Sequence, residues 1–117
     1  MLSENLIFAD TSFLADAIKS ELESEGVKVL PIKCDVTSTE DINNAAKLAE
    51  QEYGHLDILI NNAGIMDEFK PIGEVEPEYW QKVMDVNLTG PMYAMRKAVQ
   101  VMLTQEDGGN ILNIASI

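Results

Sequence analysis

The stretch Leu56-Asp57-Ile58-Leu59-Ile60-Asn61-Asn62-Ala63-Gly64 decides the fold, because it joins a short apolar run to an abrupt turn of small polar residues. Apart from Asp57, residues 56–60 are aliphatic, and a run this short fits a strand that is buried on both faces of a parallel sheet. The residues that follow end the strand, since Gly64 accepts a positive φ or a close approach to its backbone and the asparagines offer amide donors and acceptors. Ligands bind at the carboxyl edge of open α/β sheets, so we expect residues 61–64 to border a ligand site.

The segments on either side of this stretch predict further parallel strands with helices between them. Apolar runs of strand character also occupy residues 6–9, 27–32 and 110–115. Apolar residues at helical spacing fill the intervals: one pattern ends at Gly26, the next ends at Gly54, and the last begins at Pro77. Strands that alternate with helices call for parallel pairing through right-handed crossovers. The predicted fold class is therefore α/β, a parallel sheet with helices on both faces.

Local signals in these elements add finer expectations. Pro31 has no N–H for a strand ladder, so the strand at 27–32 should lie at a sheet edge. Thr37 and Glu40 have the spacing of a capping box, which predicts the start of a helix. A kink or break is expected at Gly90-Pro91 in the long C-terminal helix. The inward side of that helix is predicted to carry Trp80, Val83, Met84, Leu88, Met92, Met95, Ala98, Val99, Met102 and Leu103.

The composition indicates one globular domain of 117 residues, with 46% hydrophobic residues and a mean hydropathy of −0.04. No apolar run reaches membrane-spanning length and the N-terminus lacks the order of a signal peptide, so we expect no membrane partner and a cytoplasmic location. Asp and Glu number 20 against 8 Lys and Arg, a formal charge of −12 that argues against a nucleic-acid partner. The one cysteine, Cys34, is expected to be buried and the one histidine, His55, to be solvated, which leaves no His/Cys cluster for a metal.

Four polar residues stand where a ligand edge is expected, and each has a structural interpretation beside the functional one. Asn87 lies on the predicted inward side of the long helix, where its amide is either structural glue or part of a site. Asp10 and Asp35 each follow a predicted strand, where an acid accepts hydrogen bonds from a ribose 2′-hydroxyl or simply caps a helix or turn. Ser116 follows the last strand, either in the ligand crevice or in a plain turn. Taken singly, these residues do not decide a function.

Taken together, the polar segments resemble those of the short-chain dehydrogenase/reductase family. The matching segments, in the family's order and approximate spacing, are Asp10, Asp35-Val36, Asn61-Asn62-Ala63-Gly64, Asp85-Val86-Asn87 and Asn113-Ile114-Ala115-Ser116. The resemblance implies a Rossmann-like fold and an NAD(P)-dependent oxidoreductase that interconverts a carbonyl and an alcohol by hydride transfer, similar to the 3-oxoacyl carrier-protein reductase branch. It also implies a small-molecule substrate and a homo-oligomer in the complete protein.

The resemblance also gives roles to individual residues. It places Asp10 at the adenosine ribose of the cofactor, Asp35 and Val36 at the adenine, and Asn62, Ala63 and Gly64 at the ribose side. Ser116 matches the catalytic serine that hydrogen-bonds the substrate oxygen, and Asn87 matches the asparagine that completes a proton-relay water site. Because Asp10 has no Arg or Lys beside it, NAD is expected in preference to NADP.

Parts of the family pattern are absent from these 117 residues, which we therefore interpret as a single partial dinucleotide-binding domain. No glycine-rich TGxxxGxG turn precedes Asp10, and no YxxxK motif follows Ser116. In the family's strand order the absent first strand is central, so a gap is expected between residues 6–9 and 56–60. Tyr93 and Lys97 have the YxxxK spacing but precede the serine strand, and we interpret them as an ordinary surface pair.

The sequence leaves more than one function open. The chain is expected to be a segment of an NAD(P)-dependent oxidoreductase that is inactive on its own. The alternative is a non-catalytic module that binds a nucleotide or a partner subunit, and a third interpretation is an incomplete reading frame whose product never accumulates.

Overall fold

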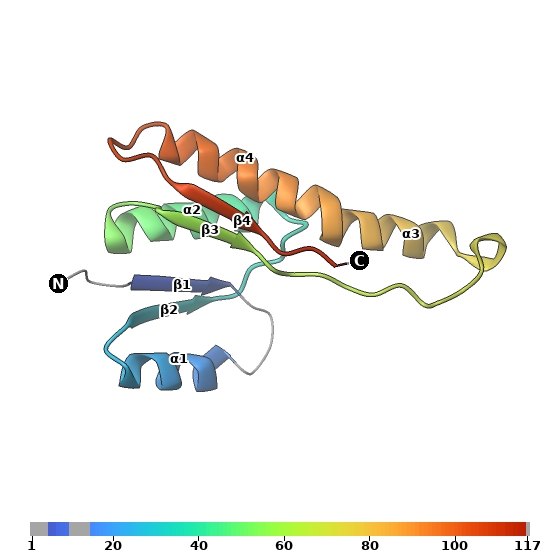
Figure 1. Cartoon of the computed structure of the whole chain (residues 1–117), viewed down its shortest axis with the longest axis horizontal. Helices are drawn as coiled ribbons and strands as arrows, with labels where there is room; N and C mark the ends of the chain where they lie inside the picture. Colours follow the sequence, from blue (N-terminus) through green and yellow to red (C-terminus); the bar gives the residue numbers. More distant parts are fainter. Residues whose placement is uncertain (1–4, 10–14, 117) are drawn as a thin grey trace.

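The computed structural model describes residues 5–9 and 15–116, which form the expected alternation of strands and helices (Figure 1). The order along the chain is β1 (Asn5–Ala9), α1 (Ala15–Ser24), β2 (Lys28–Ile32), α2 (Thr39–Tyr53), β3 (Ile58–Asn61), the 3₁₀ turn η1 (Ile72–Glu74), α3 (Pro77–Met84), the π-helical turn η2 (Asp85–Thr89), α4 (Gly90–Met102) and β4 (Asn110–Asn113). The predicted α/β fold class is confirmed. Within the described ranges no helix is long and apolar enough to cross a membrane.

The strands form two parallel pairs instead of one continuous sheet. β1 pairs with β2, with Leu6 opposite Val29, and β3 pairs with β4, with Asn61 opposite Asn113. Among the described strands β2 has a neighbour on one side only, so the prediction that Pro31 lies in an edge strand is confirmed. β1 and β3 do not pair with each other, which agrees with the gap expected between these two segments.

Helices lie on two sides of the strands. α1 contacts β2, whereas α2 contacts β1 and α4, and α4 in turn contacts β3. The β1–β2 pair therefore lies between α1 and the layer formed by α2 and α4 (Figure 1). The buried apolar side chains come from β2, α2, α4 and the segment after β2; they are Val29, Cys34, Ile42, Ala49, Ala98, Val101 and Met102. The expectation that Cys34 is buried is confirmed, and burial raises the pKa of its thiol, with Asp41 and Asp35 adding to the effect.

The apolar run in β3 is less buried than predicted. Ile58 and Ile60 are 61% and 54% exposed, so the prediction of a strand buried on both faces is wrong. Leu59, which points to the opposite face by the alternation of a strand, is half-buried, and α4 contacts this strand. A strand that pairs on one side and is covered on one face leaves its alternate side chains in solvent.

The inward side predicted for the long helical region is also partly wrong. Of the residues assigned to it, the exposed ones are Trp80, Leu88, Met92, Val99 and Leu103. The buried positions of α4 are Gly90, Ala98, Val101 and Met102, so the prediction is confirmed for Ala98 and Met102. Apolar residues occur around most of this helix, but α2 and β3 cover only part of its surface, so the remaining apolar residues face outward.

A π-helical turn interrupts the α-helix directly before Gly90-Pro91, the dipeptide at which a kink or break is expected. η2 immediately precedes this dipeptide, the N–H of Gly90 donates to the carbonyl of Asp85 five residues back, and the helix continues as α4. In an α-helix the ring of Pro91 would crowd the carbonyl of Asn87. A π turn widens the helix locally, which explains how the proline is accommodated without a break.

The first turn of α2 is capped one residue later than predicted. Ser38 is the N-cap, and its hydroxyl accepts a hydrogen bond from the N–H of Asp41 at 3.2 Å. The predicted Thr37/Glu40 capping box is therefore wrong, and the Thr37 hydroxyl donates instead to Asp35 Oδ1 at 2.7 Å. At the other end Gly54, with a φ of 80°, caps the helix as expected.

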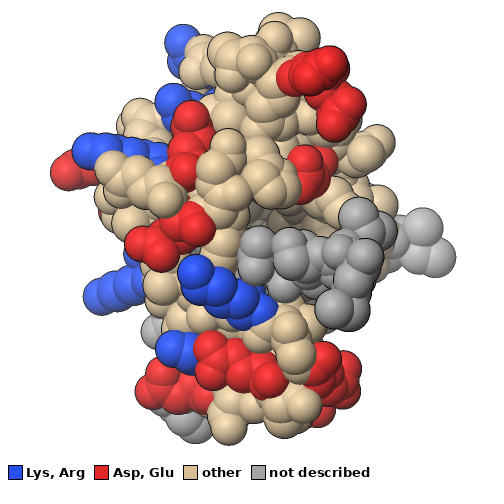
Figure 2. Space-filling model, turned by 90° about the vertical axis from the view of Figure 1, so that its left-hand side faces the viewer, with Lys and Arg blue, Asp and Glu red and all other residues tan. Residues whose placement is uncertain are grey.

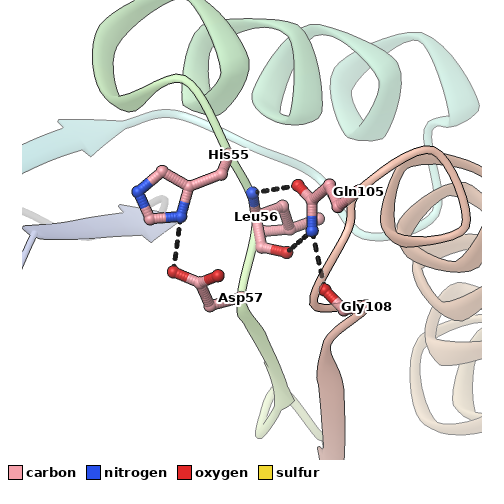
Figure 3. Close-up of polar contacts among 5 residues, drawn as sticks. All are labelled: His55, Leu56, Asp57, Gln105 and Gly108. Carbon is pink, nitrogen blue, oxygen red and sulfur yellow. Dashed lines mark hydrogen bonds and ion pairs between the residues drawn. The ribbon is translucent and has the colours of Figure 1, made fainter.

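One glutamine fixes the amino ends of β3 and β4. Gln105 Oε1 accepts a hydrogen bond from Leu56 N at 2.7 Å, and Nε2 donates to the carbonyls of Leu56 and Gly108, both at 2.8 Å (Figure 3). The neighbouring His55 pairs with Asp57, and its 52% exposed side chain confirms a solvated histidine. Figure 2, which views the molecule from this end of β3 and β4, shows acidic and basic side chains interspersed on the surface. The contacts of Gln105 therefore hold together the two segments that lead into β3 and β4.

The chain exposes more surface than a compact monomer of its mass. Its accessible surface is 8724 Å² and its radius of gyration is 16.0 Å. Scaling relations for compact single chains give roughly 6,300 Å² and about 13.4 Å. Large exposed apolar side chains on β3, β4 and the long helical region contribute to the difference. Surface of this kind marks places where further protein or a ligand packs.

Gly90 is predicted to be required by packing. A Cβ at this position would lie 2.8 Å from the carbonyl oxygen of Val36 and 3.1 Å from Val36 Cγ2. Gly90→Ala should therefore lower the free energy of unfolding by about 1–3 kcal/mol, as overpacking does, despite the higher helix propensity of alanine. Urea unfolding followed by circular dichroism measures this. Gly73→Ala is the matched control, because a Cβ there meets no atom within 4 Å; equal effects of the two substitutions would contradict the prediction.

Candidate functional site

The carboxyl ends of β3 and β4 are joined by their side chains as well as by the strand ladder. Asn61 Nδ2 donates to Asn113 Oδ1 at 2.8 Å, and the N–H of Ile114 donates to the carbonyl of Asn61 at 2.9 Å. Asn113 Nδ2 in turn lies 3.4 Å from Met95 Sδ on α4. The turn at residues 62–64 and the segment that carries Ser116 therefore leave the sheet from neighbouring, mutually bonded positions.

Asn87 ties the turn after β3 to the long helical region. Its Oδ1 accepts a hydrogen bond from Ile65 N, and its Nδ2 donates to the carbonyl of Ile65, both at 2.8 Å. A Cβ on Gly64 would lie 3.4 Å from Asn87 Oδ1, so the turn and the amide are in direct contact. The expectation of a buried Asn87 is wrong, because its side chain reaches outward to the loop that passes over the helix; its amide nevertheless has partners, as predicted.

Asp35 is held in a network at the start of α2. Its Oδ1 accepts hydrogen bonds from the N–H and hydroxyl of Thr37, at 2.9 and 2.7 Å, and its own N–H donates to Asp41 Oδ2 at 2.8 Å. The hydroxyl bond, followed by the backbone bond, lowers the pKa of Asp35 below its ordinary value of 3.8. These hydrogen bonds favour the ionised form of the exposed carboxylate and fix its orientation.

A groove of about 690 Å³ runs between the Asp35 loop and the helical region that carries Asn87. Its lining residues are Asp35, Thr37, Pro77, Glu78, Gln81, Lys82, Asp85 and Val86. Directly after η2, the carbonyl of Val36 lies against Gly90, the first residue of α4. η2 therefore contacts or adjoins both the loop after β2 and the turn after β3.

The structure brings some of the predicted site residues together and leaves others apart or outside. Asp35 lines a groove with Asp85 and Val86 of η2, Val36 lies against Gly90 at the start of α4, and Gly64 meets Asn87. The other turn residues, Asn62 and Ala63, are exposed at the end of β3, and Ser116 is exposed on the segment after β4. Asp10 lies outside the described residues.

Sequence reasoning missed several supporting residues of this edge. Asp41 orients the Asp35 backbone, and Gln81 Nε2 donates to Asp85 Oδ1 at 2.8 Å beside the groove. Gln81 and Asp85 are one helical turn apart, and this spacing in the sequence indicates that their side chains can form a hydrogen bond. Tyr93 and Lys97, which the sequence predicts to be an ordinary surface pair, are both half-buried on α4.

The parallel α/β architecture, with its polar residues collected at the carboxyl edge, defines a Rossmann-like protein. The short chain dehydrogenase family matches residues 3–117, and the chain belongs to this family. A 3beta-hydroxysteroid dehydrogenase 2 of Eggerthella lenta is 42% identical over 101 residues, which are 86% of this chain and 39% of the relative. A galactitol 2-dehydrogenase of Agrobacterium fabrum is 41% identical over 85 residues, which are 73% of this chain and 33% of the relative.

Solved structures agree with this assignment. A short chain dehydrogenase from Mycobacterium smegmatis has a TM-score of 0.88 at 31% identity, and the match covers 97% of this chain and 47% of that one. The NAD+-bound xylitol dehydrogenase has a TM-score of 0.90 at 26% identity, covering 96% of this chain and 43% of that one. The chain thus spans between a third and a half of the length of these relatives.

The contact between Asn87 and Ile65 is predicted to hold the turn at residues 62–64 in place. Asn87→Ala removes both hydrogen bonds and should lower the free energy of unfolding by about 1–2 kcal/mol. Asn87→Asp keeps the acceptor but sets a carboxylate oxygen against the Ile65 carbonyl, so it should destabilise at least as much at neutral pH. Hydrogen exchange of the Ile65 amide, followed by NMR, should accelerate in Asn87→Ala, which removes the acceptor of this N–H. Asn44→Ala, at an exposed position of α2, is the control; an unaltered Ile65 exchange rate in Asn87→Ala would refute the assignment.

Proposed function

We propose that the chain is part of an NAD(P)-dependent oxidoreductase that interconverts a small-molecule carbonyl and alcohol, with residues 1–117 forming a single partial dinucleotide-binding domain. The observation that carries the proposal is that two loops adjoin the same short helical segment, residues 85–90. Asp35 lines a groove with Asp85 and Val86, Val36 lies against Gly90, and the turn at Gly64 is bonded through Ile65 to Asn87. Membership of the family and the likeness to the NAD+-bound xylitol dehydrogenase support it.

The residues present fit the adenosine and ribose parts of a dinucleotide. The groove beside Asp35 is open enough for a planar base, and the exposed turn of Asn62, Ala63 and Gly64 offers backbone and amide groups to a ribose. Asp10 would bind the adenosine ribose, which favours NAD over NADP by charge. These 117 residues contain no TGxxxGxG turn, so they do not include the family's pyrophosphate-binding element.

Ser116 and Asn87 carry the proposed chemistry of this segment. The Ser116 hydroxyl would hydrogen-bond the substrate oxygen and Asn87 would complete the water site of a proton relay, while NAD(P), when bound, would supply or accept the hydride. Pro91 has no N–H to donate to the carbonyl of Asn87 four residues earlier, so that oxygen lacks its ordinary α-helical donor, which supports such a role. Because no YxxxK tyrosine follows Ser116 in this sequence, we infer little or no hydride transfer by residues 1–117 alone.

The proposal also covers the substrate, the cellular location and the oligomeric state of the protein. The relatives named above include dehydrogenases of a hydroxysteroid and of a sugar alcohol, while the sequence resembles the 3-oxoacyl carrier-protein reductase branch. We propose a cytoplasmic protein and a homo-oligomer, with the exposed apolar residues of α3 and α4 available for the subunit contact. A purely non-catalytic binding module has less support, since Ser116 leaves the sheet at the same edge as the cofactor-facing turn.

Nucleotide binding by the 117-residue chain tests the proposal. In a titration of ¹⁵N-labelled protein followed by NMR, NADH should shift the amide signals of Val36 and Gly64, since both loops contact it. AMP, which carries only the adenosine half, should shift Val36 and leave Gly64 in place. The amide of Gly108, at the opposite edge, is the internal control and should not move. The absence of shifts at Val36 and Gly64 with millimolar NADH would contradict the proposal.

The assignment of Asp10 predicts a change in cofactor preference. Asp10→Ala removes the carboxylate that repels the 2′-phosphate of NADPH, so the ratio of the dissociation constants of NADPH and NADH should fall several-fold, in line with the loss of one nearby charge. Fluorescence titration with both nucleotides gives this ratio. Asp16→Ala, in the first turn of α1, removes the same charge six residues later in the sequence and serves as the control. An Asp10→Ala ratio equal to that of the control would refute the role given to Asp10.

A further inference from the structure

The groove beside Asp35 has polar side chains on both of the segments that form it. On the loop after β2, Asp35 Oδ1 accepts hydrogen bonds from the N–H and hydroxyl of Thr37, and among the described residues nothing donates to its other oxygen, Oδ2. On the helical segment lie Gln81 of α3 and Asp85 of η2, which line the same groove. A ligand in the groove would therefore meet a carboxylate from one segment and an amide–carboxylate pair from the other.

A hydrogen bond determines which end of the Gln81 amide is available to a ligand. Gln81 Nε2 donates to Asp85 Oδ1 at 2.8 Å. An ionised carboxylate only accepts hydrogen bonds, so the NH₂ group of the amide has to turn toward it and the amide oxygen turns away. Among the described residues nothing donates to Gln81 Oε1. Asp85 thus orients Gln81 with an acceptor available to the groove.

The hydroxyl donor of the groove is also occupied, and most of the charged groups are acceptors. The Thr37 hydroxyl donates to Asp35 Oδ1 at 2.7 Å. Among the described residues that line the groove, three are carboxylates, Asp35, Glu78 and Asp85, and one is a cation, Lys82. Lys82 is four residues from Glu78 and three from Asp85, spacings at which carboxylates on a helix attract an ammonium group. The groove therefore offers mainly acceptors to a ligand.

Resting on the proposed function, we propose that Gln81, oriented by Asp85, determines base specificity: its Oε1 and the Asp35 carboxylate each accept one hydrogen of the exocyclic amino group of adenine. The family resemblance gives Asp35 a place at the adenine, and the structure adds Gln81 as the second acceptor. Hypoxanthine carries a carbonyl oxygen at the same ring position, and this oxygen would face both acceptors without a donor. A site built to accept from an N–H rejects an analogue that lacks it, because the polar groups stay unpaired.

AMP and IMP test the inference with the whole 117-residue chain, because their bases differ in this amino or carbonyl group and in the proton on the adjacent ring nitrogen. In ¹⁵N-labelled protein, the amide signal of Val36 gives the dissociation constants of both nucleotides by NMR titration. The constant for IMP should be about ten-fold larger than that for AMP, as expected for one to two lost hydrogen bonds at an exposed site.

Variants of Gln81 separate its role from that of the carboxylates. Gln81→Met removes the amide but keeps a long side chain of similar helix propensity, so the ratio of the IMP and AMP constants should fall several-fold. Gln81→Glu keeps an acceptor and should retain the preference for AMP. Gln51→Met, at an exposed position in the last turn of α2, is the matched control and should leave the ratio unchanged.

Two further variants test the orientation of the amide and the role of the cation. Asp85→Ala leaves the Gln81 amide able to turn its NH₂ group toward the IMP oxygen, so the ratio should fall several-fold. Lys82→Met removes the charged donor that would favour IMP, so the ratio should stay the same or rise. An unchanged ratio in Asp85→Ala would refute the orienting role, and a lost preference for AMP in Lys82→Met would show that the lysine contacts the base instead.

The outcome for the base is distinguishable from the outcome for the proposed function. Equal constants for AMP and IMP, or an unchanged ratio in Gln81→Met, would refute the inference, while NADH shifts at Val36 and Gly64 would still support the proposed function. A preference for AMP without any effect of NADH on Gly64 would support the base specificity and refute the proposed function. The absence of shifts with every nucleotide would refute both.

Discussion

The carboxyl edge of this chain depends on the two hydrogen bonds between the Asn87 amide and the backbone of Ile65. They connect positions 22 residues apart and bind the turn after β3 to the helical region that leads into α4. An amide suits this contact because it donates and accepts at once, matching the N–H and carbonyl of one residue. On the other side of the same helical turn, Val36 packs against Gly90, so one short segment positions both loops.

The local sequence of this segment explains why it takes the form of a π turn. Pro91 cannot donate a hydrogen bond and would crowd the carbonyl four residues earlier, while Gly90 leaves room for the backbone of Val36. The result is a widened helix at the point where the loops meet, a feature often found at functional sites. The dipeptide Gly90-Pro91 thus favours the π turn and permits the close packing of Val36 against Gly90.

Exposed apolar surface is the other consequence of this architecture. β1 and β3 stay unpaired with each other, and Ile58 and Ile60 of β3 remain largely in solvent. The small buried core comes from one side of α2 and α4 and from β2, so tertiary contacts are concentrated around those elements. Relatives of the chain are about twice its length, and the additional residues can cover such surfaces in those proteins.

The sequence by itself determined the order of strands and helices, the edge position of Pro31 and the cap at Gly54, because hydrophobic periodicity, proline and glycine act locally. It also determined the family to which the chain belongs, because the order of the motifs along the chain can be compared directly. Only the tertiary structure decided which apolar residues are buried, where α2 is capped and how Asn87 is used. Burial depends on which layers are present: Ile58 and Met92 have the same apolar character as core residues, yet no layer covers them. The partner of Asn87 lies 22 residues away, a separation that no local pattern encodes.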